Sequence, residues 1–400
     1  MKKLLVLAIV LRLLIMPFFF HPDIKTYHFQ ASFLQKGVFN IYPYLIENRE
    51  QLPLREEFVY FPLTYFFLGG YQALVSPLLG DNFTNWLADA SGRAVESPQT
   101  FRYLFLLKLP YLALDIFAAF VLMQLFEKKK DKKKVFALWL FNPFSLILIY
   151  FFSNVDIIPV VLVLLTLLAM KKKKPLAASL ALALAVGFKA YPVLFLPFLL
   201  AKTESWADRI KSLAVFVLTT IAIILPFWSP AFVASSFASG LTNRILEAGV
   251  SISGGERILI VPAALFILYI FSWYKEVPLW KYFFAALLLV IPFIHFHIQW
   301  LLWIAPFAAV YVVRQVNKAW LVLLAAVTSF AVPFLYNDKF MSVSLLTPIS
   351  KWFSLIPVPF AIVQRLGDPY LVQSVVHSVF IGCSLALIWQ IFNGHKNEQN

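Results

Sequence analysis

Long apolar runs, separated by short basic clusters, recur along the whole of this chain and restrict its fold more than any other feature. Runs such as 101–126, 213–228 and 370–392 have lengths near the roughly 20 residues that a helix needs to cross a bilayer. Within the hydrocarbon every backbone amide needs an internal partner, so runs of this kind fold as helices. With a mean hydropathy of +0.79, the sequence predicts an all-α, polytopic integral membrane protein in one unit, residues 1–400, without a soluble domain.

The basic clusters lie between the apolar runs, at 128–134, 171–174 and 202–211. Basic loops stay on the cytoplasmic side of a membrane, so these clusters predict the orientation of the helices. The same placement accounts for the net charge of +14, and no nucleic-acid partner is expected.

The apolar runs between these clusters predict ten to twelve spans, beginning with an uncleaved first span at 4–20. Several runs between 135 and 201 are too short for a full crossing. Helices this short must end within a thinned bilayer or in a cavity sealed by other protein, which predicts an aqueous cavity on the outer side.

Two segments near the N-terminus are expected to lie along the membrane instead of crossing it. The segment 27–36 has its apolar residues on one face, the pattern of a short interfacial helix. The apolar run 61–79 begins and ends outside if the lysines at 128–134 lie inside, and its prolines and glycines disfavour one straight helix. The first outer loop is therefore expected to be long and structured.

Asp23 is the carboxylate of greatest interest, because it follows the aromatic end of the first apolar run by only three residues. Partial desolvation in a cavity raises the pKa of a carboxylate toward that of a useful general base. The alternative is that Asp23 caps the helix that follows it. Both interpretations are open from position alone.

Other polar side chains gather with Asp23 at the predicted outer ends of the spans. Ionisable residues in apolar segments are functional candidates, because burying one unpaired is costly. Lys189 has no carboxylate near it in the sequence, and a lipid phosphate is the anion that it is expected to bind. On a helix His295 and His297 would point in different directions, so no metal site is expected from them. The outer set comprises Asp23, Asp156, Lys189, His295, His297 and Gln299.

For three of the ionisable residues, a structural role and a role in the site are equally open. Lys108 and Asp115 lie seven residues apart on one helical face, either as an ion pair that joins helices or as substrate contacts. Asp156 follows a Ser-Asn pair and is either a turn or helix cap or a polar wall of the cavity.

Short motifs that include these residues follow one another between residues 23 and 306. They are Asp23-x3-Tyr27-x3-Ala31 with Gly37 and Asn40-Ile41-Tyr42, Phe58-Val59-Tyr60-Phe61-Pro62-Leu63, Lys108-x6-Asp115, Trp139-Leu140-Phe141-Asn142-Pro143, Phe188-Lys189-Ala190-Tyr191-Pro192, and Gln299-Trp300-Leu301-Leu302-Trp303-Ile304-Ala305-Pro306.

In this order the motifs resemble those of the polytopic glycosyltransferases of the C superfamily (GT-C). The chain looks closest to the GPI mannosyltransferase I catalytic family and to bacterial polyprenol-phosphate-mannose-dependent mannosyltransferases. One departure concerns the first loop, where the family often has paired acidic residues and this chain has Lys25 two residues after Asp23. No metal or other cofactor is therefore expected, although the family has an optional metal site.

The resemblance implies an inverting transferase that moves a hexose, most simply mannose, from a polyprenyl-phosphate donor to a hydroxyl of a glycan or lipid acceptor. Asp23 would be the catalytic base, and Lys189 with His297 would hold the donor phosphate. The active site would face the outside of the plasma membrane, or the lumen of the endoplasmic reticulum in a eukaryote. The residues expected to line the substrate cavity are Tyr27, Tyr60, Lys108, Asp115, Asp156, Tyr191, His295 and Gln299.

A flippase for lipid-linked sugars, or another transporter, is the alternative function, because it would also be polytopic with intramembrane ionisable residues. A transporter needs access from both sides and charges near the midplane of paired repeats. The polar candidates of this chain gather on one face, which favours the enzyme. A non-catalytic assembly subunit is a third interpretation.

Overall fold

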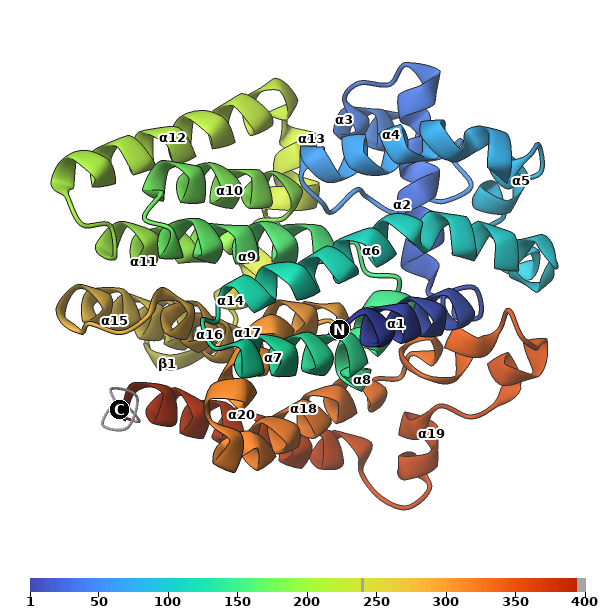
Figure 1. Cartoon of the computed structure of the whole chain (residues 1–400). Coiled ribbons are helices and arrows are strands. Elements are labelled where there is room, and N and C mark those ends of the chain that lie inside the picture. Colours follow the sequence, from blue (N-terminus) through green and yellow to red (C-terminus); the bar gives the residue numbers. More distant parts are fainter. Residues whose placement is uncertain (239–240, 394–400) are drawn as a thin grey trace.

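The computed structural model describes residues 1–238 and 241–393, which form helices and one short β-hairpin (Figure 1). The expected all-α class is confirmed. The first third contains α1 (Lys2–Ile15), α2 (Pro22–Ser32), α3 (Ile41–Glu47), α4 (Pro62–Leu79), α5 (Phe83–Ala88), α6 (Gln99–Gln124), α7 (Lys129–Phe141) and α8 (Pro143–Leu146).

The middle of the chain ends in the hairpin, and the C-terminal part is again helical. The middle contains α9 (Ile157–Lys171), α10 (Pro175–Phe188), α11 (Leu196–Ala201), α12 (Trp206–Ile224), α13 (Pro230–Phe232), α14 (Leu241–Ile245), β1 (Gly249–Ser253) and β2 (Glu256–Leu259). The last part contains α15 (Ile260–Tyr274), α16 (Leu279–Val290), α17 (Leu301–Arg314), α18 (Ala319–Phe334), α19 (Pro359–Gln364) and α20 (Pro369–Asn393).

Short 3₁₀ or π-helical turns join or extend several of these helices. They are η1 (Phe33–Lys36), η2 (Arg93–Glu96), η3 (Ile147–Phe151), η4 (Tyr191–Phe195), η5 (Leu225–Phe227), η6 (Val233–Phe237), η7 (Ile291–Phe293), η8 (Ile298–Trp300), η9 (Val316–Lys318), η10 (Lys339–Met341), η11 (Val343–Leu346) and η12 (Lys351–Leu355).

Helices of two lengths make up the apolar part of this multi-pass membrane protein. In the described residues, four are long and apolar enough to cross a bilayer, and the bent pair of α7 with Pro143–Phe151 forms a fifth candidate. The expectation of shorter apolar helices is confirmed, and their crossing of the membrane stays a prediction, as does the total of ten to twelve spans. The shorter ones are Ile157–Lys171, Pro175–Phe188, Tyr191–Ala201, Ile260–Tyr274, Leu279–Phe293 and Ile298–Arg314.

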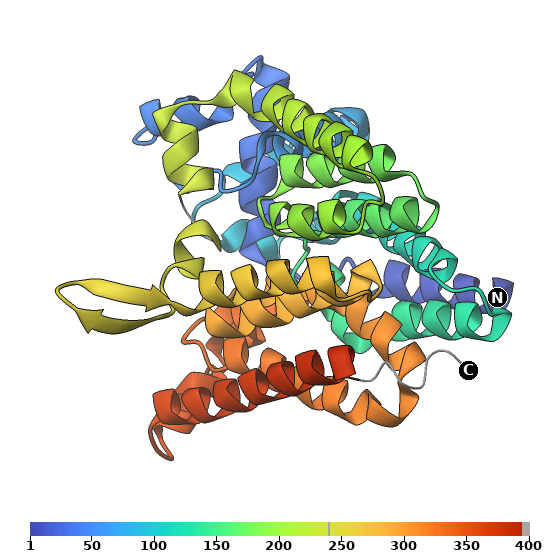
Figure 2. The ribbon, with the colours of Figure 1, turned by 90° about the vertical axis from the view of Figure 1, so that its left-hand side faces the viewer.

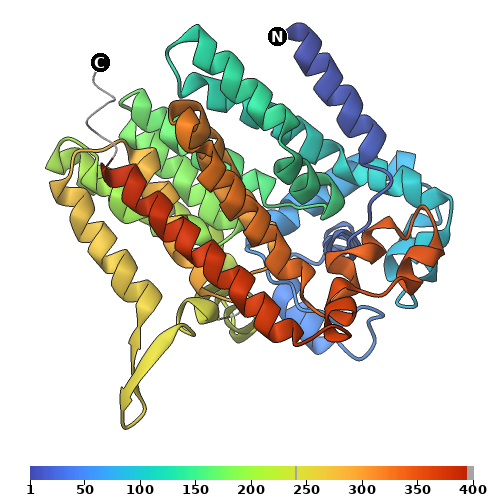
Figure 3. The same ribbon diagram turned by 90° about the horizontal axis from the view of Figure 1, so that it is seen from below.

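The helices pack in layers, with α9, α10 and α12 stacked on one side and α18 against α20 on the other (Figures 1 and 3). α16 is the most enclosed helix, since every side chain from Trp280 to Leu288 is buried. α12 exposes most of its apolar side chains and α20 exposes many of them, as lipid-facing helices do. The hairpin of β1 and β2 projects away from the helices (Figure 2).

The first apolar helix is shorter than expected. The predicted span 4–20 is helical only as α1, which ends at Ile15. Pro17 has no N–H group to continue the helix, and the chain beyond it is held by a hydrogen bond from the Phe20 amide to the Leu345 carbonyl at 2.9 Å. The residues just before the first outer loop are therefore fixed to the C-terminal half of the molecule.

The expected interfacial helix is present, but other parts of the protein cover its polar residues. α2 begins at Pro22, five residues before the expected start, because His21 caps it and Pro22 suits the first helical position. It packs against α4, and the polar side chains of Lys25, His28 and Gln30 are all buried. These polar residues thus face neighbouring protein and not water, while the position of α2 at the membrane surface stays a prediction.

α4 is one continuous helix, and the expectation that its glycines disfavour a straight helix is wrong. A Cβ atom at Gly69 would lie 2.7 Å from Leu34 Cδ2 and 2.8 Å from the Ala31 carbonyl oxygen, so the glycine permits close packing on α2 and η1. Pro77 falls in the last turn. α4 is not among the helices apolar enough to span a membrane, and its position along the outer side stays a prediction.

Candidate functional site

The candidate site forms where the start of α2, the turn before α9, the end of α10 and the start of α17 meet. At its centre the side chain of Asp23 is 26% exposed. Gln299 Nε2 donates a hydrogen bond to Asp23 Oδ2 at 2.6 Å. His21 Nδ1 lies 3.5 Å from Asp23 Oδ1 and also accepts the Asp23 amide at 3.3 Å, so the histidine caps α2 while touching the carboxylate. The cap role offered for Asp23 thus belongs to His21.

His297 completes this group, which we call the Asp23 cluster: His21, Asp23, His297 and Gln299. The rings of His21 and His297 are 5.8 Å apart and nearly perpendicular. His297 comes directly before η8, which brings Gln299 to the same place. Among the described residues, His21 Nε2 and His297 Nδ1 are buried without a hydrogen-bond partner.

The charge states of the cluster follow from burial and from mutual attraction. Burial raises the pKa of Asp23, but His21, His297, the hydrogen bond from Gln299 and the charge of Lys189 together outweigh it, so this pKa lies below its ordinary value. Burial lowers the pKa of His297 to about 4, against the opposing effect of Asp23. Near neutral pH Asp23 is therefore a carboxylate beside a neutral His297 imidazole. Burial raises the pKa of Asp23 as expected, but neighbours that were not visible in the sequence reverse the net shift.

Lys189 and Asp156 form a bidentate ion pair next to the cluster. Lys189 Nζ lies 2.8 Å from Oδ1 and 2.7 Å from Oδ2 of Asp156, and Trp303 Nε1 donates to the same Oδ2 at 2.8 Å. The Asp156 side chain is inaccessible, whereas that of Lys189 is 16% exposed. The premise that Lys189 lacks a partner is wrong, because its carboxylate lies 33 residues away in the sequence.

Aromatic rings form the walls around this pair. Lys189 Nζ lies 4.5 Å from the ring centre of Tyr60 and 5.3 Å from that of Trp303. Tyr27 meets Tyr60 edge-on at 4.8 Å, and Tyr191 stacks on Trp303 at 4.0 Å. Burial, followed by the nearby carboxylates, raises the pKa values of Tyr27 and Tyr60 well above the ordinary value, so both phenols stay neutral. The residues expected in the site that the structure brings together are Asp23, Tyr27, Tyr60, Asp156, Lys189, Tyr191, His297 and Gln299.

Lys108 was expected in the substrate cavity but is fully buried and bonded within the protein. Its Nζ donates to the carbonyls of Met16 at 2.8 Å, Phe19 at 2.5 Å and Tyr150 at 2.7 Å. These three acceptors use all the donors of an ammonium group. Lys108 therefore holds the end of α1 to α6 and the turn after α8, and it does not reach the cavity.

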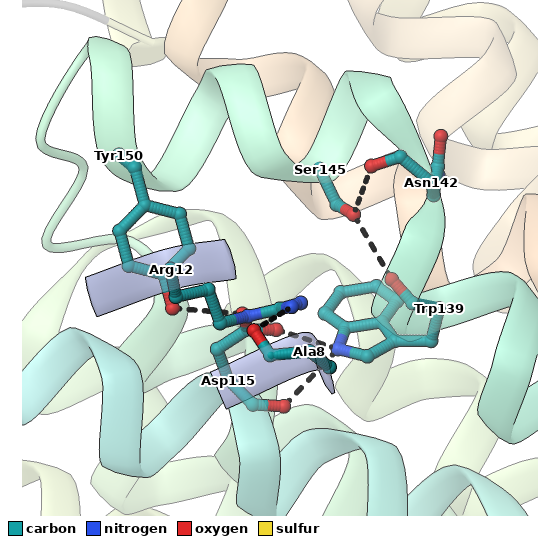
Figure 4. Close-up of polar contacts among 7 residues, drawn as sticks. All are labelled: Ala8, Arg12, Asp115, Trp139, Asn142, Ser145 and Tyr150. Atoms are coloured by element: carbon teal, nitrogen blue, oxygen red, sulfur yellow. Dashed lines mark hydrogen bonds and ion pairs between the residues drawn. The ribbon is translucent and has the colours of Figure 1, made fainter. Parts of the chain in front are cut away.

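Asp115 was also expected to line the substrate cavity. It instead lies at the centre of a group of polar side chains that solvent does not reach (Figure 4). Arg12 Nε lies 2.6 Å from Asp115 Oδ2, and both side chains are inaccessible. Trp139 Nε1 donates to Oδ1 at 2.7 Å and Tyr150 Oη donates to Oδ2 at 2.9 Å. We call these four residues the Arg12 network. Asp115 thus joins helices as an ion pair, with Arg12 and not with Lys108.

His295 is the other expected site residue that lies elsewhere. Its exposed ring stacks on Tyr336 at 4.8 Å, and Arg244 Nη1 donates to its backbone carbonyl at 2.7 Å. Burial, followed by the charge of Arg244, lowers the pKa of His295. It borders the outer segment 336–369 instead of the Asp23 cluster.

Sequence reasoning missed two residues of importance. Arg12 lies in the middle of the first apolar run, and a cation in such a run needs a buried partner. His21 stands two residues before Asp23, and the pair of a histidine and a carboxylate beside a proline was visible in the sequence.

A polar cavity of about 420 Å³ adjoins the first turn of α2 on another side. Lys25 lines it and forms an ion pair with Asp89 at 3.6 Å, and its Nζ also donates to the Asp89 carbonyl. Phe20, Pro22 and Phe340 form its wall next to His21. Room for a polar ligand therefore exists beside the residues that carry the site.

Comparison with known families gives one match. Residues 149–238 match the family described as Mannosyltransferase (PIG-M). The match supports a glycosyltransferase, and within that class a mannosyltransferase, in agreement with the resemblance found in the motifs. The matched segment includes Asp156, Lys189 and Tyr191 of the site. A search of curated proteins found no match to the chain.

Proposed function

We propose that this protein transfers mannose from a polyprenyl-phosphate donor to a hydroxyl of a membrane-bound glycan or lipid, with inversion, on the outer side of the membrane. The mannosyltransferase match supports the sugar and the reaction class. The observation that carries the mechanism is that Asp23 is a partly exposed carboxylate, whereas Asp156 is buried and fully bonded.

In this mechanism Asp23 is the general base. The acceptor oxygen forms a bond to the anomeric carbon while the bond from that carbon to the phosphate oxygen breaks. The acceptor proton passes to Asp23, and the electron pair of the broken bond leaves with the phosphate. One displacement inverts the anomeric centre and needs one carboxylate acting as base. The lowered pKa of Asp23 keeps it ionised, so it is ready to accept the proton.

Lys189 supports departure of the phosphate. Asp156, itself hydrogen-bonded by Trp303, holds its position, and the Lys189 side chain stays partly exposed. A fixed cation at the place where negative charge develops stabilises the transition state without reorganisation. The aromatic faces around Lys189 suit the apolar face of a sugar ring, and the polar cavity beside α2 suits the rest of the acceptor.

The test is transfer of label from radiolabelled polyprenyl-phosphate mannose in membranes that contain the protein. We expect label in an acceptor when wild-type protein is present and background label with Asp23→Asn. Movement of intact donor between leaflets without formation of a new glycoside would contradict the proposal and support the transporter.

A further inference from the structure

Two of the helices that carry the site have their other ends at a second cavity. α9 begins directly after Asp156, and α17 contains Trp303 in its first turn. At about 1.5 Å per residue, these helices reach roughly 20 Å away from the site. Lys171 ends α9 and Arg314 ends α17, and both residues line the second cavity. This cavity therefore lies at the opposite end of the helices from the Asp23 cluster.

The second cavity, which we call the basic cavity, has a volume of about 370 Å³. Pockets that hold small ligands have volumes of about 300–1,000 Å³. Its charged residues are Lys171, Lys202 and Arg314, and no carboxylate of the described residues lines it. Apolar side chains such as Leu167 and Val310 form the rest of the lining. The lining thus suits a ligand that is both anionic and apolar.

The protein neutralises the lysines of the basic cavity only weakly. Lys171 Nζ donates to the last carbonyl of α6 at 2.8 Å and lies 2.6 Å from Glu127. Lys202 Nζ donates to the carbonyl that follows α15 at 2.9 Å and lies 3.6 Å from Glu276. The two glutamate side chains are 82% and 89% exposed, and ion pairs with exposed carboxylates contribute little. An ammonium has three N–H donors, so each lysine keeps capacity for an anion.

Aromatic rings hold the third cation of the basic cavity. The Arg314 guanidinium carbon lies 4.9 Å from the ring centre of Phe126 and 5.8 Å from that of Trp280. Trp280 lines the cavity and is only 8% exposed, whereas Arg314 is exposed. A guanidinium presents planar paired donors that match the oxygens of a phosphate.

The position of the basic cavity indicates where its ligand comes from. Lys171 and Lys202 belong to the basic clusters 171–174 and 202–211, which predict the cytoplasmic face. The cytoplasmic leaflet carries anionic lipids, and basic pockets between transmembrane helices on this side bind their head groups. A free phosphate ester would use the cations of the lining, whereas a phospholipid would use its apolar side chains as well.

We propose that the basic cavity binds one anionic phospholipid of the leaflet opposite the site. Lys171, Lys202 and Arg314 hold its phosphate, and the apolar lining holds the first part of an acyl chain. The lipid joins the ends of α6, α9 and α17 to the start of α16, because residues of all four helices or of their ends line the cavity. This binding does not rest on the proposed function.

The experiment measures lipid binding to the full-length protein, delipidated in a neutral detergent, by native mass spectrometry and by the unfolding temperature. Phosphatidylglycerol, phosphatidylcholine and soluble glycerol 3-phosphate are the three probes. We expect one tightly bound phosphatidylglycerol per chain, a higher unfolding temperature with it, and weaker binding of the other two. Lys202→Gln with Arg314→Gln should weaken phosphatidylglycerol about 25-fold, at about fivefold for each cation removed.

Lys133→Gln with Lys134→Gln is the matched control, because it removes two exposed lysines of the cluster 128–134 that do not line the cavity. It should bind phosphatidylglycerol as wild type does. Arg314→Gln alone guards against misfolding of the double variant, since Arg314 is exposed, and it should weaken binding about fivefold.

Equal affinity for phosphatidylcholine and phosphatidylglycerol would overturn the proposal, as would equal loss of binding in the cavity variant and the control. Glycerol 3-phosphate that binds as tightly as phosphatidylglycerol would also overturn it, because the ligand would then be a soluble phosphate ester. Since no sugar donor is present in these measurements, loss of the proposed transfer reaction would leave this result standing.

Discussion

The Arg12 network and the Asp23 cluster both place a carboxylate next to nitrogen donors and both contain buried nitrogens without a partner among the described residues, including Arg12 Nη2, but they differ in how fully the carboxylate is bonded and enclosed. In the Arg12 network Asp115 receives three donors and neither charged side chain is accessible. In the Asp23 cluster the carboxylate is partly exposed and two histidine nitrogens have no partner among the described residues.

This difference distinguishes residues that stabilise the fold from residues that can take part in a reaction, and it does so more clearly than burial or charge alone. A buried ion pair whose carboxylate is fully hydrogen-bonded, as that of Asp115 is, contributes to the arrangement of its helices, and breaking it leaves an uncompensated charge. Exposed lone pairs and unpartnered ring nitrogens remain available to a substrate or an ion. Substitutions in the first group should therefore affect stability, and those in the second should affect transfer.

Asp23→Asn should have the largest effect on transfer. Asparagine keeps the shape of the side chain but cannot accept the proton, so the rate should fall about 10²–10⁴-fold while the unfolding temperature changes little. Initial rates of label transfer measure this loss. Asp156→Asn is the matched control, and the base would be Asp156 if that variant were inactive while Asp23→Asn retained activity.

Arg12→Met should have the largest effect on stability. It leaves Asp115 charged and buried, which typically costs about 3–5 kcal/mol. Denaturation in detergent measures the loss, and transfer per folded molecule should stay near that of wild type. The double variant Arg12→Met with Asp115→Leu should recover part of the stability, because no unpaired charge remains. A loss of transfer without a loss of stability in Arg12→Met would contradict the comparison.

The sequence predicts the fold class and most members of the site, because each depends on local information. Apolar runs and lysine clusters predict the helices, and the order of the motifs indicates that Asp23, Lys189 and Gln299 are site residues. Which of these residues touch was not predictable. The Asp156 partner of Lys189 is 33 residues away, and the helical pattern does not say which ends meet.

The same limit explains the misplacement of Lys108 and Asp115. Their spacing of seven residues correctly places them on one face of α6, yet each binds a different neighbour. The polar residues of α2 are a similar case. A polar helix face predicts exposure to water, and the sequence does not show that other parts of the protein cover this face. In each case the missing information was long-range packing.

Variants of Lys189 and Asp156 test whether this ion pair beside the Asp23 cluster binds the donor or only stabilises the fold. The double variant Lys189→Met with Asp156→Asn removes both charges, so no buried ion is left alone. Loss of a charge-assisted contact of about 1.5–3 kcal/mol should weaken donor binding roughly 10- to 100-fold. Asp156→Asn alone keeps the cation and should retain donor binding. Unchanged affinity in a folded double variant would show that the phosphate is held elsewhere.

The smallest expected effects come from removing one hydrogen bond from each carboxylate. Tyr150→Phe removes the donor to Asp115 Oδ2, and because water cannot reach that site, stability should fall by about 1.5 kcal/mol with transfer unchanged. Gln299→Met removes the donor to Asp23 Oδ2, where water can take its place, so stability should stay within about 0.5 kcal/mol of wild type. Transfer by Gln299→Met should nevertheless fall about tenfold, because the base loses its fixed orientation. Parallel denaturation and transfer assays measure both variants, and equal stability losses would remove the distinction between an enclosed and a partly exposed carboxylate.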